Sequence, residues 1–101
     1  MRVMLRAHLD DIRLANEALA SGRLPEVMES LMAKLNPEAA YFGPSQGGRS
    51  CTIVFDMQDS ATLPTIAEPL FQELGAKIEI QPVMNADDMR KAIAAWQQQQ
   101  G

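Results

Sequence analysis

Alternation of apolar and polar side chains at the start of the chain is the feature that most constrains its fold. Over residues 1–9 the odd positions are all apolar, while the even positions include Arg2, Arg6 and His8. A period of two is typical of a β-strand with one buried face, because successive side chains in a strand point to opposite sides. Residues 49–57 show the same alternation. The chain is therefore predicted to build a sheet whose apolar face is covered by another layer.

Apolar residues at helical spacing follow the first strand. Asp10 and Asp11 stand where a helix cap belongs, and a short helix is predicted to end at Ser21-Gly22. Pro25 suits the first turn of a second helix, which Asn36-Pro37 ends. The two pieces are predicted to form one kinked unit or a helical hairpin.

The middle of the chain is predicted to be a β-hairpin. Residues 38–42 form a short candidate strand, and residues 43–48 have the glycine, proline and serine content of a turn. Residues 49–57 then form the second strand.

A helix, a strand and a last helix complete the chain. Asp59-Ser60 caps a helix that ends at Gly75, and a kink or local break is expected at Pro69. Residues 77–84 form the last strand. Asn85 caps a final helix, whose apolar face holds Met89, Ala92, Ile93 and Trp96. Residues 97–101 are expected to be a frayed tail.

The resulting order is β-α-β-β-α-β with an extra C-terminal helix. This order predicts one ferredoxin-like α+β domain over residues 1–101, with a four-stranded antiparallel sheet and a split first helix. The first and third strands are expected in the centre, and the helices are expected on one face. That face would receive an aliphatic and aromatic set: Val3, Leu5, Ile53, Phe55, Ile78 and Ile80.

Composition excludes several classes of protein. The formal net charge is −4, so nucleic acid is not an expected partner. No apolar stretch of the sequence approaches the length that spans a membrane, and no secretory signal opens the chain. A cytoplasmic location is therefore expected. Cys51 is the only cysteine, which excludes an intramolecular disulfide; it is predicted to be a small core residue. No metal-ligand spacing and no cofactor motif is present, so we expect neither group.

The second face of the predicted sheet mixes charge with apolar residues. It would hold Met4, Val54, Val83 and one aromatic, Tyr41 or Phe42, among charged side chains. Two such faces packed together would close a barrel around a semi-polar cavity, so a homodimer is predicted. The alternative is a monomer with a solvated sheet face, since scattered exposed apolar residues are common.

Three segments carry a resemblance to a known superfamily. The stretches MRVMLRAHLD, CTIVFDMQD and AKIEIQPVMNADDM resemble uncharacterised small bacterial members of the dimeric α+β barrels. That superfamily also includes cofactor-independent quinone-forming monooxygenases and muconolactone-isomerase-like proteins. The resemblance implies a dimeric barrel, and it selects no function, because several functions share this fold.

Candidate site residues lie on the mixed face. His8 is the only histidine, and antiparallel neighbours are expected to place it near Thr52 and near Glu79 or Lys77. A histidine beside a carboxylate could act as a general base; otherwise it is a polar residue at the rim of an interface or in solvent. Arg6 and Arg2 could hold an anionic group or pair across the strands with Asp56 and Glu79. The remaining candidate ligand-binding residues are Tyr41, Asp56, Glu79 and Gln81.

Three functions remain open at this point. The first is a homodimer that binds a small aromatic or hydrophobic molecule. The second is a cofactor-independent isomerase, cyclase or monooxygenase, with His8 as proton carrier and Arg6 stabilising negative charge. The third is a structural protein that binds a partner through its sheet face or its Trp96 helix, where Trp96 is predicted to be a docking anchor.

Overall fold

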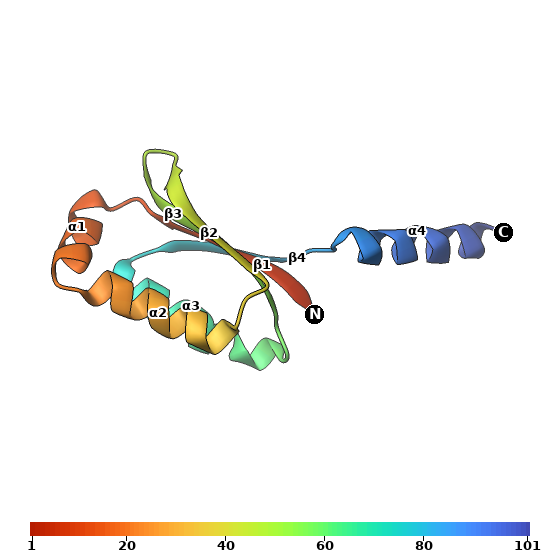
Figure 1. Ribbon diagram of the computed structural model, residues 1–101, viewed down its shortest axis with the longest axis horizontal. Coiled ribbons are helices and arrows are strands. Elements are labelled where there is room, and N and C mark those ends of the chain that lie inside the picture. Colours follow the sequence, from red (N-terminus) through yellow and green to blue (C-terminus); the bar gives the residue numbers. More distant parts are fainter.

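The computed structural model describes residues 1–101 and confirms the ferredoxin-like α+β fold (Figure 1). The split of the first helix into two pieces is also confirmed. The elements in chain order are β1 (Arg2–Leu9), α1 (Ile12–Ala20), α2 (Arg23–Leu35), β2 (Ala39–Ser45), β3 (Gly48–Asp56), a 3-10 turn (Ser60–Thr62), α3 (Leu63–Leu74), β4 (Lys77–Pro82) and α4 (Ala86–Gln100).

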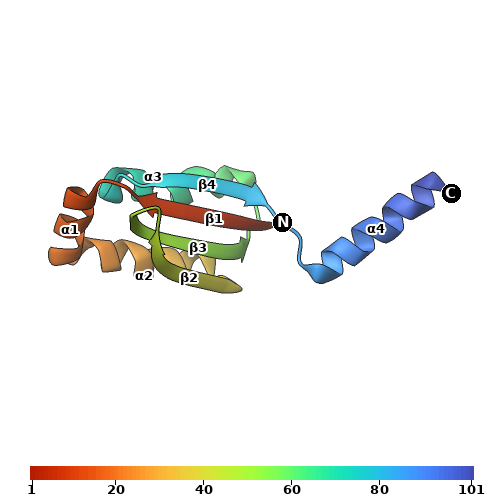
Figure 2. The same cartoon turned by 90° about the horizontal axis from the view of Figure 1, so that it is seen from above.

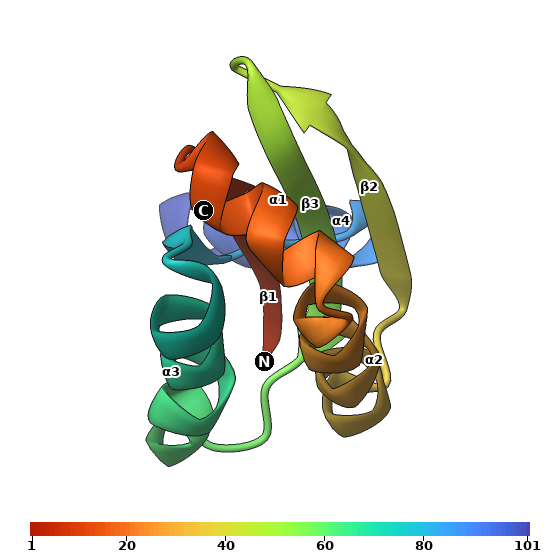
Figure 3. The same cartoon turned by 90° about the vertical axis from the view of Figure 1, so that its left-hand side faces the viewer.

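The four strands form one antiparallel sheet in the order β2-β3-β1-β4, with β1 and β3 in the centre as predicted. Helices α2 and α3 lie on one side of this sheet (Figure 1), and α1 lies at the end of the strands, in contact with both of these helices (Figure 2). Figure 3 shows α2 and α3 side by side beneath the sheet. The opposite side carries no helix, and we call it the open face.

The core lies between the sheet and α1–α3. Odd-numbered residues of β1 and β3 supply its largest buried side chains, since the period of two turns them all toward the helices. Phe55, Leu5 and Ile53 are at most 2% exposed. The helices contribute Ala15, Ala18, Leu31, Ile66, Leu70 and Leu74.

The β2–β3 hairpin is tighter than the sequence pattern suggested. Gln46 and Gly47 alone form the turn, with φ values of 53° and 79°. Two central residues with positive φ match a type I′ hairpin, which fits the right-handed twist of the strands. The predicted six-residue turn was therefore wrong: Gly43–Ser45 extend β2, and Gly48 opens β3. A proline is tolerated at Pro44 because β2 is an edge strand.

Helix α3 runs unbroken through Pro69, so the local break that was one of the two expected effects of this proline does not occur. A proline has no N–H, so it leaves the carbonyl four residues earlier without its helical donor. That carbonyl belongs to Thr65, and it accepts a hydrogen bond of 3.0 Å from Lys34 Nζ on α2. A lysine of the neighbouring helix thus replaces the missing backbone donor.

Helix α4 projects from the domain along the strand direction (Figures 1 and 2). The radius of gyration is 16.4 Å, against about 13 Å for a compact chain of this length. No residue of α4 is buried, and Trp96 is 62% exposed, so Trp96 does not dock on its own domain. The helix extends to Gln100, and a complete capping box of Asn85 and Asp88 starts it.

Candidate functional site

One row of polar side chains crosses the open face through all four strands. Tyr41 of β2 lies opposite Thr52 of β3, Thr52 lies opposite Arg6 of β1, and Arg6 lies opposite Glu79 of β4. Paired residues in antiparallel strands point to the same side of the sheet. The register therefore brings Tyr41, Arg6 and Glu79 onto one line.

His8 belongs to the neighbouring row, with Ser50 on one side and Lys77 on the other. His8 Nδ1 and Ser50 Oγ form a hydrogen bond of 2.8 Å. The expected neighbours were Thr52 and either Glu79 or Lys77. Lys77 is correct, whereas Thr52 and Glu79 both lie opposite Arg6, one row away.

The His8 ring lies above Gly48. A Cβ atom on Gly48 would stand 3.1 Å from His8 Cε1 and 2.6 Å from the carbonyl oxygen of Leu9. The second distance is shorter than real Cβ contacts allow. Glycine is required here by close approach, because this residue makes room for both the neighbouring strand and the histidine ring.

These two rows border a shallow cavity of about 300 Å³ at the hairpin end of the open face. The hairpin residues Ser45 and Gln46 form one of its walls. The structure thus brings together three of the predicted site residues, Arg6, His8 and Glu79.

Arg6 has no carboxylate within 4.0 Å, although Glu79 lies directly opposite. The cross-strand ion pair that was the alternative for this residue is absent, so its guanidinium is free to bind another anion. The same end of the sheet carries an ion pair between Asp10 and Lys77, at 2.8 Å. The hydrogen bond from Lys77 lowers the pKa of Asp10 and raises the pKa of Lys77.

Asp56 lies at the other end of the sheet. Its row is three rows from that of His8, which is about 20 Å along the strands. Its carboxylate contacts the amino group of Met1 at 2.6 Å, and this contact lowers its pKa. The predicted pairing of Asp56 with Arg2 does not form, since Arg2 instead bridges Glu38 and Asp88.

Gln81 lies between the two ends, in the row that also holds Ala39, Val54 and Met4. This row is largely apolar and adjoins the row of Arg6. The side chain of Gln81 is exposed and makes no hydrogen bond within the chain.

The register also decides which aromatic residue of β2 faces the open side. Tyr41 does, and its side chain is 73% exposed. Phe42 pairs with Cys51 on the helix side. Burial raises the pKa of the Cys51 thiol, which keeps it neutral, in keeping with the prediction of a core residue.

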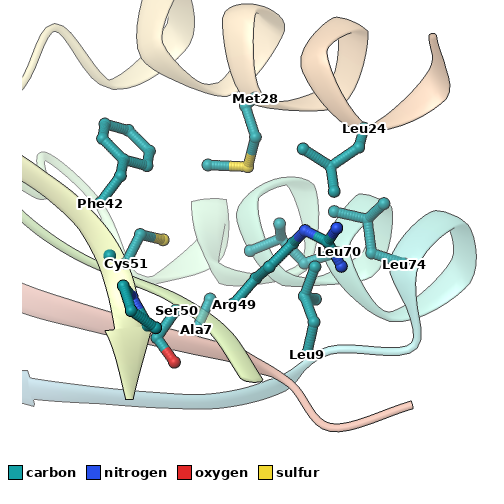
Figure 4. Close-up of a pocket in the computed structure, with 12 residues that line it drawn as sticks. Ala7, Leu9, Leu24, Met28, Phe42, Arg49, Ser50, Cys51, Leu70 and Leu74 are labelled. Atoms are coloured by element: carbon teal, nitrogen blue, oxygen red, sulfur yellow. The ribbon is translucent and has the colours of Figure 1, made fainter. Parts of the chain in front are cut away.

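Two features of the structure were not predicted from the sequence. Ser50 is the hydrogen-bond partner of His8, and only the strand register could have identified it. A second cavity of about 380 Å³ lies on the helix side of the sheet, between Leu24 and Met28 of α2 and Phe42 of β2 (Figure 4). Alternation predicts which side chains face the helices, but it does not predict that the space between them is left unfilled.

Comparison with known families gives one match, and it spans nearly the whole chain. The family described as "Domain of unknown function (DUF3303)" matches residues 1–97. The chain belongs to the DUF3303 family.

The solved structures support the fold of this DUF3303 chain and nothing finer. One that matches is the "De novo designed protein Ferredog-Diesel", with 10% sequence identity and a TM-score of 0.51, covering 81% of this chain and 85% of that chain. No curated protein matches. None of the helices has the length and apolar character that crossing a membrane requires. No group of three or more histidine, cysteine or acidic side chains is placed to hold a metal ion.

Proposed function

We infer that this DUF3303 chain forms a homodimer, in which two open faces enclose a cavity for a small aromatic or hydrophobic molecule. One observation carries this inference: the open face holds unpaired polar groups beside apolar side chains that nothing in the chain covers. Its dimeric barrel is also what the resemblance of the strand segments implies.

The apolar part of the open face suits contact between two copies. Met4 and Val54 lie opposite each other in the middle of the sheet and are only half-buried, and Tyr41 stands exposed in the next row. Contiguous exposed apolar residues with polar neighbours are typical of protein interfaces. A second copy in this position would exclude water from both faces at once.

Helix α4 supports a dimer independently of the sheet. Its exposed apolar residues Met89, Ile93 and Trp96 follow at i, i+4 and i+7, so they form one stripe. An isolated helix of 15 residues is marginal in water, and no residue of this one is buried against its own chain. Tryptophan is among the residues most enriched at interface centres. A second copy of the chain would cover the stripe of both helices.

The polar row indicates what the enclosed cavity would bind. The aromatic ring of Tyr41 and the guanidinium of Arg6 lie in one row with a single strand between them, which separates their backbones by about 10 Å. A tyrosine ring stacks on an aromatic group, and an arginine without a carboxylate partner binds an oxyanion. An aromatic molecule with one acidic or phenolic oxygen satisfies both groups.

The oligomeric state tests the dimer. We expect light scattering after size exclusion to give twice the chain mass of 11.1 kDa, and Val54→Lys to give the monomer. Gln72→Lys, on the exposed side of α3, is the matched control and should stay dimeric. Trp96 is the only tryptophan, so its emission should move to longer wavelength on dilution as the dimer dissociates. A wild-type mass of 11.1 kDa at high concentration would refute the dimer.

Ligand binding is tested with 1-naphthoate as the probe, by titration calorimetry. Arg6→Gln and Tyr41→Ala should each weaken binding, by about tenfold or more for Arg6→Gln because a charged hydrogen bond is lost. Arg13→Gln, an exposed arginine on α1 outside the site, should not. A dimer that binds no probe would favour the reading of a structural, partner-binding protein.

A second candidate function is a cofactor-independent enzyme in the same cavity, and the 2.8 Å hydrogen bond between His8 and Ser50 favours it. This bond orients the imidazole, while Nε2 makes no hydrogen bond within the chain and can carry a proton. Arg6 in the adjacent row would stabilise the negative charge that forms.

Proton abstraction is tested by exchange of the α-protons of 1-indanone with D2O, followed by NMR. The wild-type chain should accelerate the exchange, and His8→Ala should abolish the acceleration while the circular dichroism spectrum stays unchanged. Equal rates for the two proteins would remove His8 from this role.

A further inference from the structure

The helix-side cavity differs in chemistry from the open face. Buried side chains of Leu9, Leu70 and Leu74 form its floor, at 7%, 1% and 2% exposure. Leu24 and Met28 of α2 form one wall. Phe42, Gly43 and Pro44 of β2 form the other wall (Figure 4). Its volume of about 380 Å³ lies within the roughly 300–1,000 Å³ of small-molecule sites.

The cavity is unfilled although its lining points inward. Phe42 faces the helix side and is still 60% exposed. Protein interiors are close-packed, so an aromatic side chain directed at the helices is normally covered by them. Here β2 continues to Ser45, and the side chains of α2 nearest to Phe42 leave a gap. An apolar group from outside the chain would fill this space.

One cation reaches into the cavity. Arg49 lies opposite Leu9 at the start of β3, on the helix side, and Figure 4 shows it extending among the leucines. No carboxylate lies within 4.0 Å of its guanidinium. Its partner is neutral: Nη1 donates to Oδ1 of Asn16 on α1, at 3.0 Å. Because this oxygen accepts, the side-chain NH2 group of Asn16 remains available as a second donor.

We propose that the helix-side cavity binds an amphipathic monocarboxylate. Its hydrocarbon part occupies the space between Met28 and Phe42, and its carboxylate accepts hydrogen bonds from Arg49 and from the Asn16 amide. The apolar lining favours a hydrocarbon chain, and a single guanidinium balances a single negative charge. A dianion such as a phosphate monoester would leave a charge unpaired beside the leucines.

The site is separate from the one inferred on the open face. The two cavities share the strand residues Ala7, Ser50 and Cys51, and they lie on opposite sides of the sheet. Arg6, His8 and Glu79 border only the open-face cavity, while Arg49 and Phe42 border only the other. Substitutions on either side therefore distinguish failure of one proposal from failure of the other.

Decanoate, below its micelle-forming concentration, is the probe, and decanol is its uncharged analogue. By calorimetry we expect Arg49→Gln to weaken decanoate binding about 10- to 100-fold and to leave decanol binding unchanged. Arg13→Gln, an exposed arginine outside both cavities, should bind both probes as the wild type does. Arg6→Gln should also leave decanoate binding unchanged.

Cys51 provides a second measurement of the same site, because it is the only cysteine and it lines the cavity. Bound decanoate should slow alkylation of Cys51 in the native chain, and Met28→Phe, which narrows the cavity, should remove this protection. The proposal is refuted if decanoate gives no protection, or if Arg49→Gln and Arg13→Gln bind decanoate equally well.

Discussion

Gly48 is the residue whose replacement tests the geometry of the open-face site most directly. In Gly48→Ala the new methyl group would stand 2.6 Å from the Leu9 carbonyl oxygen. Real contacts of this kind begin at about 3.0 Å, so the two strands must separate by roughly 0.4 Å. The obstacle is backbone, which cannot rotate away as a side chain can. The methyl group also meets His8 Cε1 at 3.1 Å, so the imidazole must move relative to Ser50.

Overpacking of this kind costs about 1–3 kcal/mol of unfolding free energy. For a domain of this size, each 1 kcal/mol shifts the melting temperature by about 4–8 °C. We therefore expect Gly48→Ala to melt at least about 4 °C below the wild type in thermal circular dichroism. The NMR signals of the His8 ring should shift as well, because its hydrogen bond to Ser50 is disturbed.

Gly43→Ala is the matched control in the same hairpin. Gly43 of β2 lies opposite Ser50 of β3, and a Cβ atom on Gly43 would meet nothing within 4 Å. This variant should be neutral, or more stable by about 0.4–1 kcal/mol, because alanine restricts the unfolded chain. Equal melting temperatures for Gly48→Ala and the wild type would show that the close approach of Gly48 and Leu9 is not as the structure describes.

Two ion and hydrogen-bond contacts give further predictions. Lys34→Met should lower the unfolding free energy by up to about 1 kcal/mol, because the Thr65 carbonyl loses its donor. In the Pro69→Ala background the backbone N–H of residue 69 is restored, so Lys34→Met should be nearly neutral there. Urea denaturation measures both effects. A cost for Lys34→Met that is equal in both backgrounds would contradict this account. The pKa of Asp10 is lowered, so its contact with Lys77 stabilises the fold at pH values above 3.8, the ordinary pKa of this carboxyl group. This stabilisation is lost as the pH falls through the lowered pKa. Asp10→Asn should therefore lose less stability than the wild type on acidification, and high salt should reduce the difference because both groups are exposed.

The sheet and its buried face could be predicted because the pattern is local and repeats. Alternation through β1 and β3 assigns Leu5, Ile53 and Phe55 to one side, and burying them requires a covering layer. The extent of β2 could not be predicted in this way. Gly43 and Pro44 have turn propensity, and only the pairing with β3 shows that an edge strand accommodates them.

The contacts of the candidate site depend on strand register, which is a long-range property. Alternation places His8 and Arg6 on the same face as Glu79, and this could be predicted. It does not decide which residue of β3 stands beside His8, because a shift of two residues keeps every side chain on its face. The hydrogen bond to Ser50 follows from the observed register. The absence of an ion pair at Arg6 does not, because Glu79 lies directly opposite it. Similarly, the stripe on α4 is visible in the sequence, while its separation from the domain is not.

The distribution of ion pairs indicates which end of the sheet is available for ligands. At the end where α4 begins, Arg2 is held between Glu38 and Asp88. At the hairpin end, Arg6 on the open face and Arg49 on the helix side have no carboxylate partner. The chain has 13 acidic and nine basic residues besides histidine, so acidic groups are not scarce. Two arginines that remain unpaired at one end of the same sheet, each bordering a cavity, are available to anions from outside the chain, and it is at this end that binding should be sought.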